Sequence, residues 1–150
     1  MNVERFTTGL ASPLKFSGAI VSGLLLALSL PKLDLYHFSW ISLLPLLLLI
    51  FSEATIFGAC MIGYAAGLAY YSGTFYWIAT TISTYGGISP LLSLGVFALF
   101  VLVFSLHTAI FAAMLRVLTL KFGSYGLFLA GPLWVAIELL QTYLIFGGFP

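Results

Sequence analysis

Residues 63–87 read "GYAAGLAYYSGTFYWIATTISTYGG", and this stretch decides the fold. Gly63, Gly67 and Tyr71 recur every four residues, so they share one face of a helix. A Gly-x-x-x-Gly pair on such a face allows the backbone of a second helix to approach closely. The stretch therefore predicts a long helix, over about residues 56–81, that packs densely against a neighbour.

The second half of the stretch is unlike the rest of the chain. Five aromatic side chains lie within positions 70–77, hydroxyl side chains follow, and the pair Gly86-Gly87 closes the segment. Tyr and Trp prefer the boundary between lipid and water, because one end of each side chain is apolar and the other is polar. We interpret this part as the outer edge of a membrane domain, with the glycine pair ending the helix.

The overall composition also indicates a membrane protein. Hydrophobic residues make up 62% of the 150 residues and charged residues only 6%, whereas a soluble domain carries about 25% charged residues. A hydrocarbon core about 30 Å thick requires about 20 apolar residues per helix, which leaves room for about five spans. The net charge of +1 does not indicate a nucleic-acid-binding protein.

We therefore expect an all-α, polytopic membrane protein with about five transmembrane helices in one bundle. Residues 1–13 are predicted to be a cytoplasmic N-terminal segment and residues 14–150 one transmembrane domain. The first apolar segment could instead be a cleaved signal peptide. The second apolar segment is short, so it is either a tilted helix or a segment buried by its neighbours. Ser52 is a possible N-cap of the third helix. The predicted spans are residues 14–30, 39–51, 56–81, 91–115 and 127–146.

The basic residues predict the orientation. If the N-terminus is cytoplasmic, Arg5, Lys15, Arg116 and Lys121 lie on the inner side and only Lys32 lies outside. Lys and Arg are enriched in cytoplasmic loops, so this orientation is favoured over the reverse.

Glu138 is an ionisable residue near the middle of the fifth predicted span. An acidic side chain at that depth costs about 2.5–3.5 kcal/mol on insertion scales. Trp134, Glu138 and Gln141 share one helical face, so we expect the Glu138 carboxyl to face the interior of the bundle. It has either a structural role or a supporting role at a site. His107 is expected to be a packing residue, with a bond to Glu138 as the alternative.

The chain offers no recognisable catalytic or metal-binding constellation. Cys60 lies in an apolar run and is expected to be a buried packing residue. No metal-ligand spacing, phosphate loop or catalytic triad can be assembled, so no catalytic residue, metal or cofactor is predicted. The residues alone predict a small helical membrane domain with a polar, aromatic patch at its outer edge.

Three stretches together resemble the apolipoprotein N-acyltransferases. The Gly63–Gly87 stretch resembles the third-helix region of this family, and "LALSLPKLDLYHFSWISLLPLLLL" (residues 26–49) resembles its first two helices. "GPLWVAIELLQTYLIFGGFP" (residues 131–150) resembles a Pro-x-x-Trp-x-x-x-Glu helix that ends in Gly-Phe-Pro. One departure is Gln141, where the family usually has Arg.

The resemblance implies an enzyme of the bacterial inner membrane, multi-pass and with a cytoplasmic N-terminus. The family transfers an acyl chain from a phospholipid donor to the α-amine of a diacylglyceryl lipoprotein acceptor, without a cofactor. The family's Glu-Lys-Cys triad lies in a later, nitrilase-like domain, so these 150 residues would form a membrane platform and be inactive alone.

The resemblance and the outer patch together predict which residues line the platform where the two lipid substrates meet. The predicted substrate-binding residues are Tyr71, Trp77, Tyr85, Gly86, Gly87, Trp134 and Glu138.

Two alternatives to this enzymatic function stay open. One is a non-enzymatic helical membrane protein, such as a small transporter or an assembly subunit. The other is a short homologue that has lost catalysis.

Overall fold

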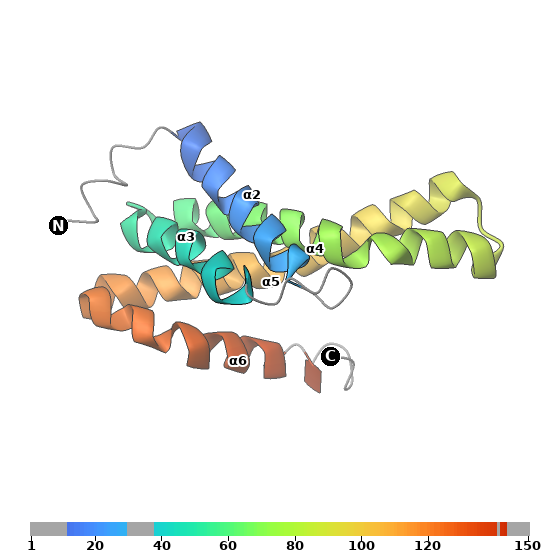
Figure 1. Cartoon of the computed structure of the whole chain (residues 1–150). Coiled ribbons are helices and arrows are strands. Elements are labelled where there is room, and N and C mark those ends of the chain that lie inside the picture. Colours follow the sequence, from blue (N-terminus) through green and yellow to red (C-terminus); the bar gives the residue numbers. More distant parts are fainter. Residues whose placement is uncertain (1–11, 30–37, 141, 144–150) are drawn as a thin grey trace.

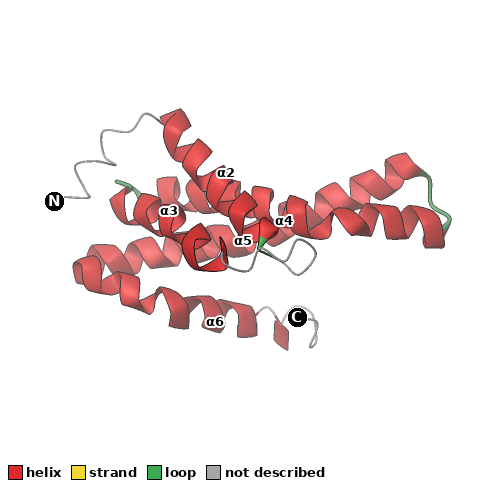
Figure 2. Ribbon diagram, in the orientation of Figure 1, coloured by secondary structure: helices red, strands yellow, loops and turns green. Residues whose placement is uncertain are grey.

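The computed structural model describes residues 12–29, 38–140 and 142–143, and all regular structure within these ranges is helical (Figure 2). The prediction of an all-α chain is confirmed. The predictions for residues 1–11, Lys32 and Gln141 concern positions outside the described residues. The elements are α2 (Ser12–Leu28), α3 (Phe38–Ser52), α4 (Ile56–Gly86), α5 (Pro90–Phe122), the 3-10 helix η1 (Gly123–Leu129) and α6 (Ala130–Leu140).

The two longest helices form an antiparallel hairpin (Figure 1). α4 has 31 residues and α5 has 33, which correspond to about 46 Å and about 50 Å of helix. Gly87 ends α4 in the left-handed conformation, with φ of 64°, and Pro90 starts α5. The glycine pair thus ends the helix as predicted. The predicted end at Thr81 is too early, because the hydroxyl-rich segment continues the helix as far as Gly86.

Glycines set the close approach of α4 to α5. A Cβ atom on Gly67 would lie 3.0 Å from the Cα of Ser105 and would overlap the Thr108 hydroxyl, and a Cβ on Gly63 would overlap the Cβ of Ala112. Both glycines are buried. The expected packing of this face against another helix is confirmed, and the partner is α5.

α2 packs on α4 as well, and it ends well before α4 does. A Cβ on Gly23 would overlap the carbonyl of Ala66, and one on Gly73 would lie 2.7 Å from the Cβ of Ala27. Ala27 is in the last turn of α2, so α2 ends level with Gly73. Figure 1 shows that the α4–α5 hairpin continues beyond α2, α3 and α6.

The opposite end of the bundle is tied together by charged side chains. Lys15 of α2 and Glu53, in the turn between α3 and α4, form an ion pair with an N–O distance of 2.9 Å. Arg116 of α5 donates a hydrogen bond of 2.6 Å to the carbonyl of Phe51, in the last turn of α3. This bond satisfies a carbonyl that the helix itself leaves without a partner. The basic residues Lys15 and Arg116, predicted to share one side, do lie at the same end.

The turn between α3 and α4 corrects one capping prediction. Thr55, and not Ser52, is the N-cap of α4: its Oγ1 accepts a hydrogen bond of 2.9 Å from the backbone N–H of Gly58. Ser52 is the last residue of α3, and its hydroxyl donates to the carbonyl of Leu48. The hydroxyl of Ser52 is therefore used within its own helix.

The last segment folds differently from the single helix predicted over residues 127–146. The chain leaves α5 through η1, and α6 begins at Ala130 and runs back beneath α5 (Figure 1). Gly126 of η1 is buried against α5, where a Cβ would lie 2.8 Å from the backbone of Leu118. The lack of a side chain at this glycine allows the turn to pack closely on α5.

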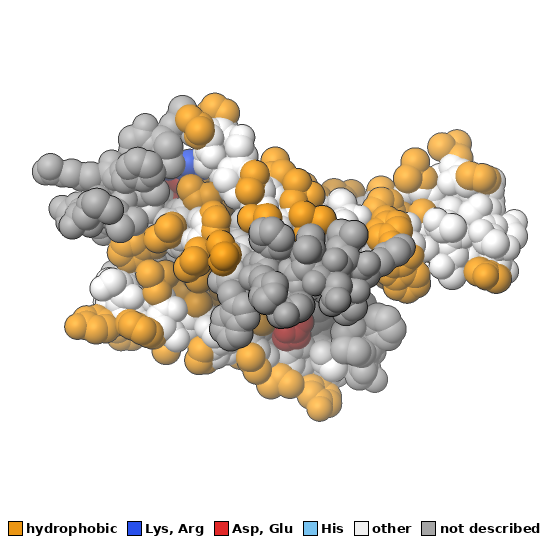
Figure 3. Space-filling model, viewed as in Figure 1, with side chains coloured by type: hydrophobic (Ala, Val, Ile, Leu, Met, Phe, Trp, Pro, Cys, Tyr) orange, Lys and Arg blue, Asp and Glu red, His pale blue; other side chains and the backbone are white. Residues whose placement is uncertain are grey.

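The surface of the described bundle is largely apolar. Large hydrophobic side chains are exposed on every described helix, and Figure 3 shows them spread over the visible face. Among the described helices, the continuous stretch Pro90–Leu140 is long and apolar enough to cross a membrane, whereas Pro13–Leu28 and Ile41–Ser52 are apolar but shorter. That all five predicted segments span a membrane stays a prediction.

Candidate functional site

Tyr71 is a core residue and not part of an exposed edge. Its side chain is only 7% exposed, and its ring centroid lies 5.3 Å from that of Phe75 and 5.6 Å from that of Phe104 on α5. Tyr71 follows Gly67 by four residues, so it belongs to the face that packs against α5. The Tyr71 ring is therefore covered by α5, because the periodicity that joins the two helices also places this ring between them. That Tyr71 contributes to substrate binding stays a prediction.

The other predicted residues of the hairpin are accessible. Trp77 is 51% exposed and Tyr85 is 87% exposed. Gly86 and Gly87 are exposed too, and a Cβ on Gly87 would meet no atom within 4 Å. The end of the hairpin therefore presents rings and bare backbone to its surroundings.

Trp134 lies on the inner side of α6 and joins this helix to α5. Its ring stacks on His107, with a centroid distance of 5.1 Å and an interplanar angle of 25°, and meets the edge of Phe111 at 5.1 Å. His107 is buried. His107 thus has the packing role expected for it, in a contact with Trp134 that the sequence did not indicate.

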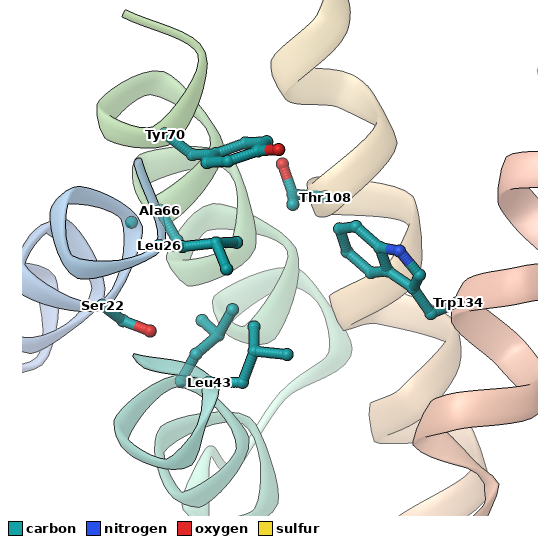
Figure 4. A pocket seen from close by; sticks show the side chains of 9 residues that line it. Ser22, Leu26, Leu43, Ala66, Tyr70, Thr108 and Trp134 are labelled. Atoms are coloured by element: carbon teal, nitrogen blue, oxygen red, sulfur yellow. The ribbon is translucent and has the colours of Figure 1, made fainter. Parts of the chain in front are cut away.

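A small hollow lies where five helices meet (Figure 4). The hydroxyl of Tyr70 points toward Thr108, and the indole of Trp134 closes the side formed by α6 (Figure 4). The volume of the hollow, about 10 Å³, suits a single water molecule and is far too small for an acyl chain. The sequence does not indicate this site, since no local pattern shows which helices converge. Its lining residues are Ser22, Gly23, Leu26, Leu43, Leu46, Ala66, Tyr70, Thr108 and Trp134.

The sequence predicts that Glu138 faces the interior of the bundle. In the structure its side chain is exposed instead. It lies one turn beyond Trp134, toward the end of α6 that diverges from α5 in Figure 1. The buried residue of this turn is Ile137. Glu138 nevertheless lies within electrostatic range of the Tyr70 and Tyr71 hydroxyls of α4.

The described residues offer little for covalent or metal chemistry. Cys60 is half-buried on α4. Within the described ranges, no three His, Cys, Asp or Glu residues lie close enough to hold a metal ion. What the arrangement presents instead is an extended apolar surface with hydroxyl and aromatic groups at one end.

Comparison with known proteins identifies the family. The family model described as the apolipoprotein N-acyltransferase N-terminal domain matches residues 22–150. An apolipoprotein N-acyltransferase from Geobacter metallireducens is 35% identical over 133 residues, which are 88% of this chain. The chain spans only about a quarter of that relative, 25% of its length. The chain belongs to the apolipoprotein N-acyltransferase family, and it corresponds to the N-terminal domain.

Proposed function

We propose that this chain is the membrane platform of an apolipoprotein N-acyltransferase. The whole enzyme would transfer an acyl chain from a phospholipid to the α-amine of the N-terminal diacylglyceryl-cysteine of lipoproteins. The observation that carries this proposal is the family match over residues 22–150, together with a relative of that name of which the match covers 25%. These residues alone are expected to be inactive.

The platform role is supported by the chemistry of the described residues. Acyl transfer through a covalent intermediate requires a nucleophile with a base within hydrogen-bonding distance. Cys60 is the only thiol in the chain, and it lies on α4 one turn from the end that carries Glu53. The hairpin end with Trp77 and Tyr85 is at the opposite end of α4. A thiol so far from this end is not suited to act on lipid esters there.

The proposed topology places the chain across the bacterial inner membrane several times. The end with Lys15, Arg116 and Lys121 would face the cytoplasm, since basic residues favour that side. The hairpin end, near Gly87, would then lie at the outer surface. α2 and α3, at about 26 Å and about 22 Å, are shorter than a hydrocarbon core of about 30 Å, so they would cross it where the bilayer thins around them.

The proposed substrate-facing residues are those of the predicted set that are accessible. Trp77, Tyr85, Gly86 and Gly87 would meet lipid substrates at the outer surface, where Trp and Tyr anchor well. Trp134 and Glu138 would support the side of the platform below them, and Tyr71 would act only through packing.

The test uses protein made from the whole coding sequence and protein limited to residues 1–150. Each is purified and mixed with phospholipid and a diacylated lipopeptide, and the lipopeptide is analysed by mass spectrometry. The whole protein should add a third acyl chain and residues 1–150 should not. The control is Cys60→Ala in the whole protein, which should leave transfer intact.

Two results would overturn the proposal. Transfer by residues 1–150 that is lost on Cys60→Ser would make this chain a minimal enzyme. A coding sequence without a domain that carries Glu, Lys and Cys, together with an inactive whole protein, would favour a non-enzymatic membrane protein.

A further inference from the structure

Two aromatic rings lie next to each other on the outside of the turn that joins α5 to α6. A 3-10 helix has three residues per turn, so side chains three positions apart lie one above the other. In η1 these positions are Tyr125 and Phe128, which are 76% and 81% exposed. Gly126, between them, is buried against α5. One side of the turn therefore packs on α5, and the side with the two rings faces outward.

A third ring and a cation extend this surface at the end of α5. Phe122 is 47% exposed, and the Lys121 Nζ lies 5.3 Å from the centroid of the Phe122 ring. Of the described charged residues at this end of the bundle, Lys15 pairs with Glu53, and Arg116 donates to a backbone carbonyl of α3. Lys121, by contrast, is exposed. The surface therefore combines three exposed rings with an accessible positive charge.

The composition of the turn is unlike that of a loop in water. The apolar stretch Pro90–Leu140 runs through η1 without interruption, whereas loops at a wet surface are usually clusters of small polar residues with Gly and Pro. Between Glu53 and Glu138 the sequence contains no Asp or Glu, so the charge around the turn is positive. The turn therefore suits a partner that is apolar inside and anionic at its surface.

The length of α5 places the turn at the depth of lipid headgroups. The turn lies at the end of α5 that is far from Gly87 (Figure 1). α5 has 33 residues, or about 50 Å of helix, and at the usual tilt of about 20° it spans about 47 Å. A bilayer with its headgroups is about 40–45 Å thick. With Gly87 at one surface, η1 therefore lies in the headgroup layer of the opposite leaflet.

The boundary between headgroups and acyl chains suits these side chains better than water does. Exposing the rings of Phe122 and Phe128 to water is unfavourable in proportion to their apolar area. Tyr125 has an apolar ring and a polar hydroxyl, which is the combination that favours this boundary. A Lys side chain near the membrane surface is attracted to anionic lipids.

We propose that η1 is an anchor in the cytoplasmic membrane surface. The rings of Tyr125 and Phe128 insert into the boundary between headgroups and acyl chains, and Lys121 binds anionic headgroups beside them. The anchor holds the turn against the membrane and so fixes the depth at which α6 begins. The inference rests on the proposed function only for the membrane topology.

The experiment is photo-crosslinking of the whole protein in nanodiscs of phosphatidylcholine and phosphatidylglycerol in equal amounts. Benzoyl-phenylalanine replaces Tyr125 or Phe128, which it resembles in shape. It also replaces Ser124 as the control, because this exposed residue of the same turn lies off the side with the rings. After irradiation and digestion, mass spectrometry identifies each adduct as lipid or protein and distinguishes the two headgroups.

We expect strong lipid adducts at positions 125 and 128 and a several-fold weaker adduct at position 124. Attraction to a single Lys should enrich anionic lipid by about fivefold, so phosphatidylglycerol should exceed phosphatidylcholine by about that factor at position 125. Lys121→Gln should make the two headgroups about equal. The total lipid adduct should persist in this variant, which shows that it is folded.

Three results would overturn the anchor: cross-links to protein at positions 125 and 128, adducts of equal strength at all three positions, or no lipid adduct. An enrichment of phosphatidylglycerol that survives Lys121→Gln would overturn the role of Lys121. None of these readouts requires acyl transfer, so the anchor can fail while the enzymatic function stands, and the enzymatic function can fail while the anchor stands.

Discussion

Replacing Gly67 with Ala tests the close packing of α4 against α5 within the hairpin. The new methyl group would overlap the Thr108 hydroxyl and lie 3.0 Å from the Cα of Ser105. The Ser105 contact is backbone, so α5 itself must shift. Overpacking of this kind costs about 1–3 kcal/mol, and the better helix propensity of Ala offsets up to about 1 kcal/mol. We expect a net loss of about 1–2 kcal/mol.

The chain supplies a matched control in Gly95 of α5. A Cβ there would meet no atom within 4 Å, so Gly95→Ala changes helix propensity without a clash. Thermal unfolding of each purified variant in the same detergent, followed by tryptophan fluorescence, gives the comparison. Gly67→Ala should lower Tm by about 3–6 °C, and Gly95→Ala should leave it unchanged or raise it slightly.

A second substitution shows whether the clash is the cause. Thr108→Ala removes the hydroxyl that the new methyl group would overlap, so the double variant should recover part of the lost stability. Full recovery is not expected, because the Cα of Ser105 remains. The reasoning is refuted if Gly67→Ala unfolds at the wild-type temperature, or if Thr108→Ala adds its full cost to that of Gly67→Ala.

Three further predictions concern the two ends of the bundle. In a Cys60→Ala background, a cysteine at Ser89 should react with a membrane-impermeant reagent added to intact spheroplasts, and one at Ser124 should not; the reverse pattern would contradict the proposed orientation. Arg116→Ala should destabilise the chain by about 1.5–3 kcal/mol, since it removes a charged donor from the carbonyl of Phe51. Lys121→Ala, at an exposed position, is its control, and equal unfolding temperatures for the two variants would argue against this bond. Glu138→Gln should change stability by less than about 0.5 kcal/mol because the side chain is exposed; a large loss in thermal unfolding would mean that the carboxylate has a structural partner.

Much of the helical architecture could be predicted from local sequence. The low charge and high apolar content imply helices in an apolar solvent, because only helices satisfy their own backbone hydrogen bonds within one segment. Gly87 ends α4 because it adopts a left-handed conformation without strain. The spacing of Gly63 and Gly67 placed both on one face, since that follows from the period of the helix alone.

The tertiary structure decided what covers each face. The period places Gly67 and Tyr71 together, but it does not say that α5 lies over both and buries the Tyr71 ring. The helical period also predicts a shared face for Trp134 and Glu138. Because α6 diverges from α5, Trp134 packs on His107 whereas Glu138 is exposed. The physical reason is that helical periodicity is a local property of consecutive residues, whereas burial depends on where segments far apart in the sequence come to lie.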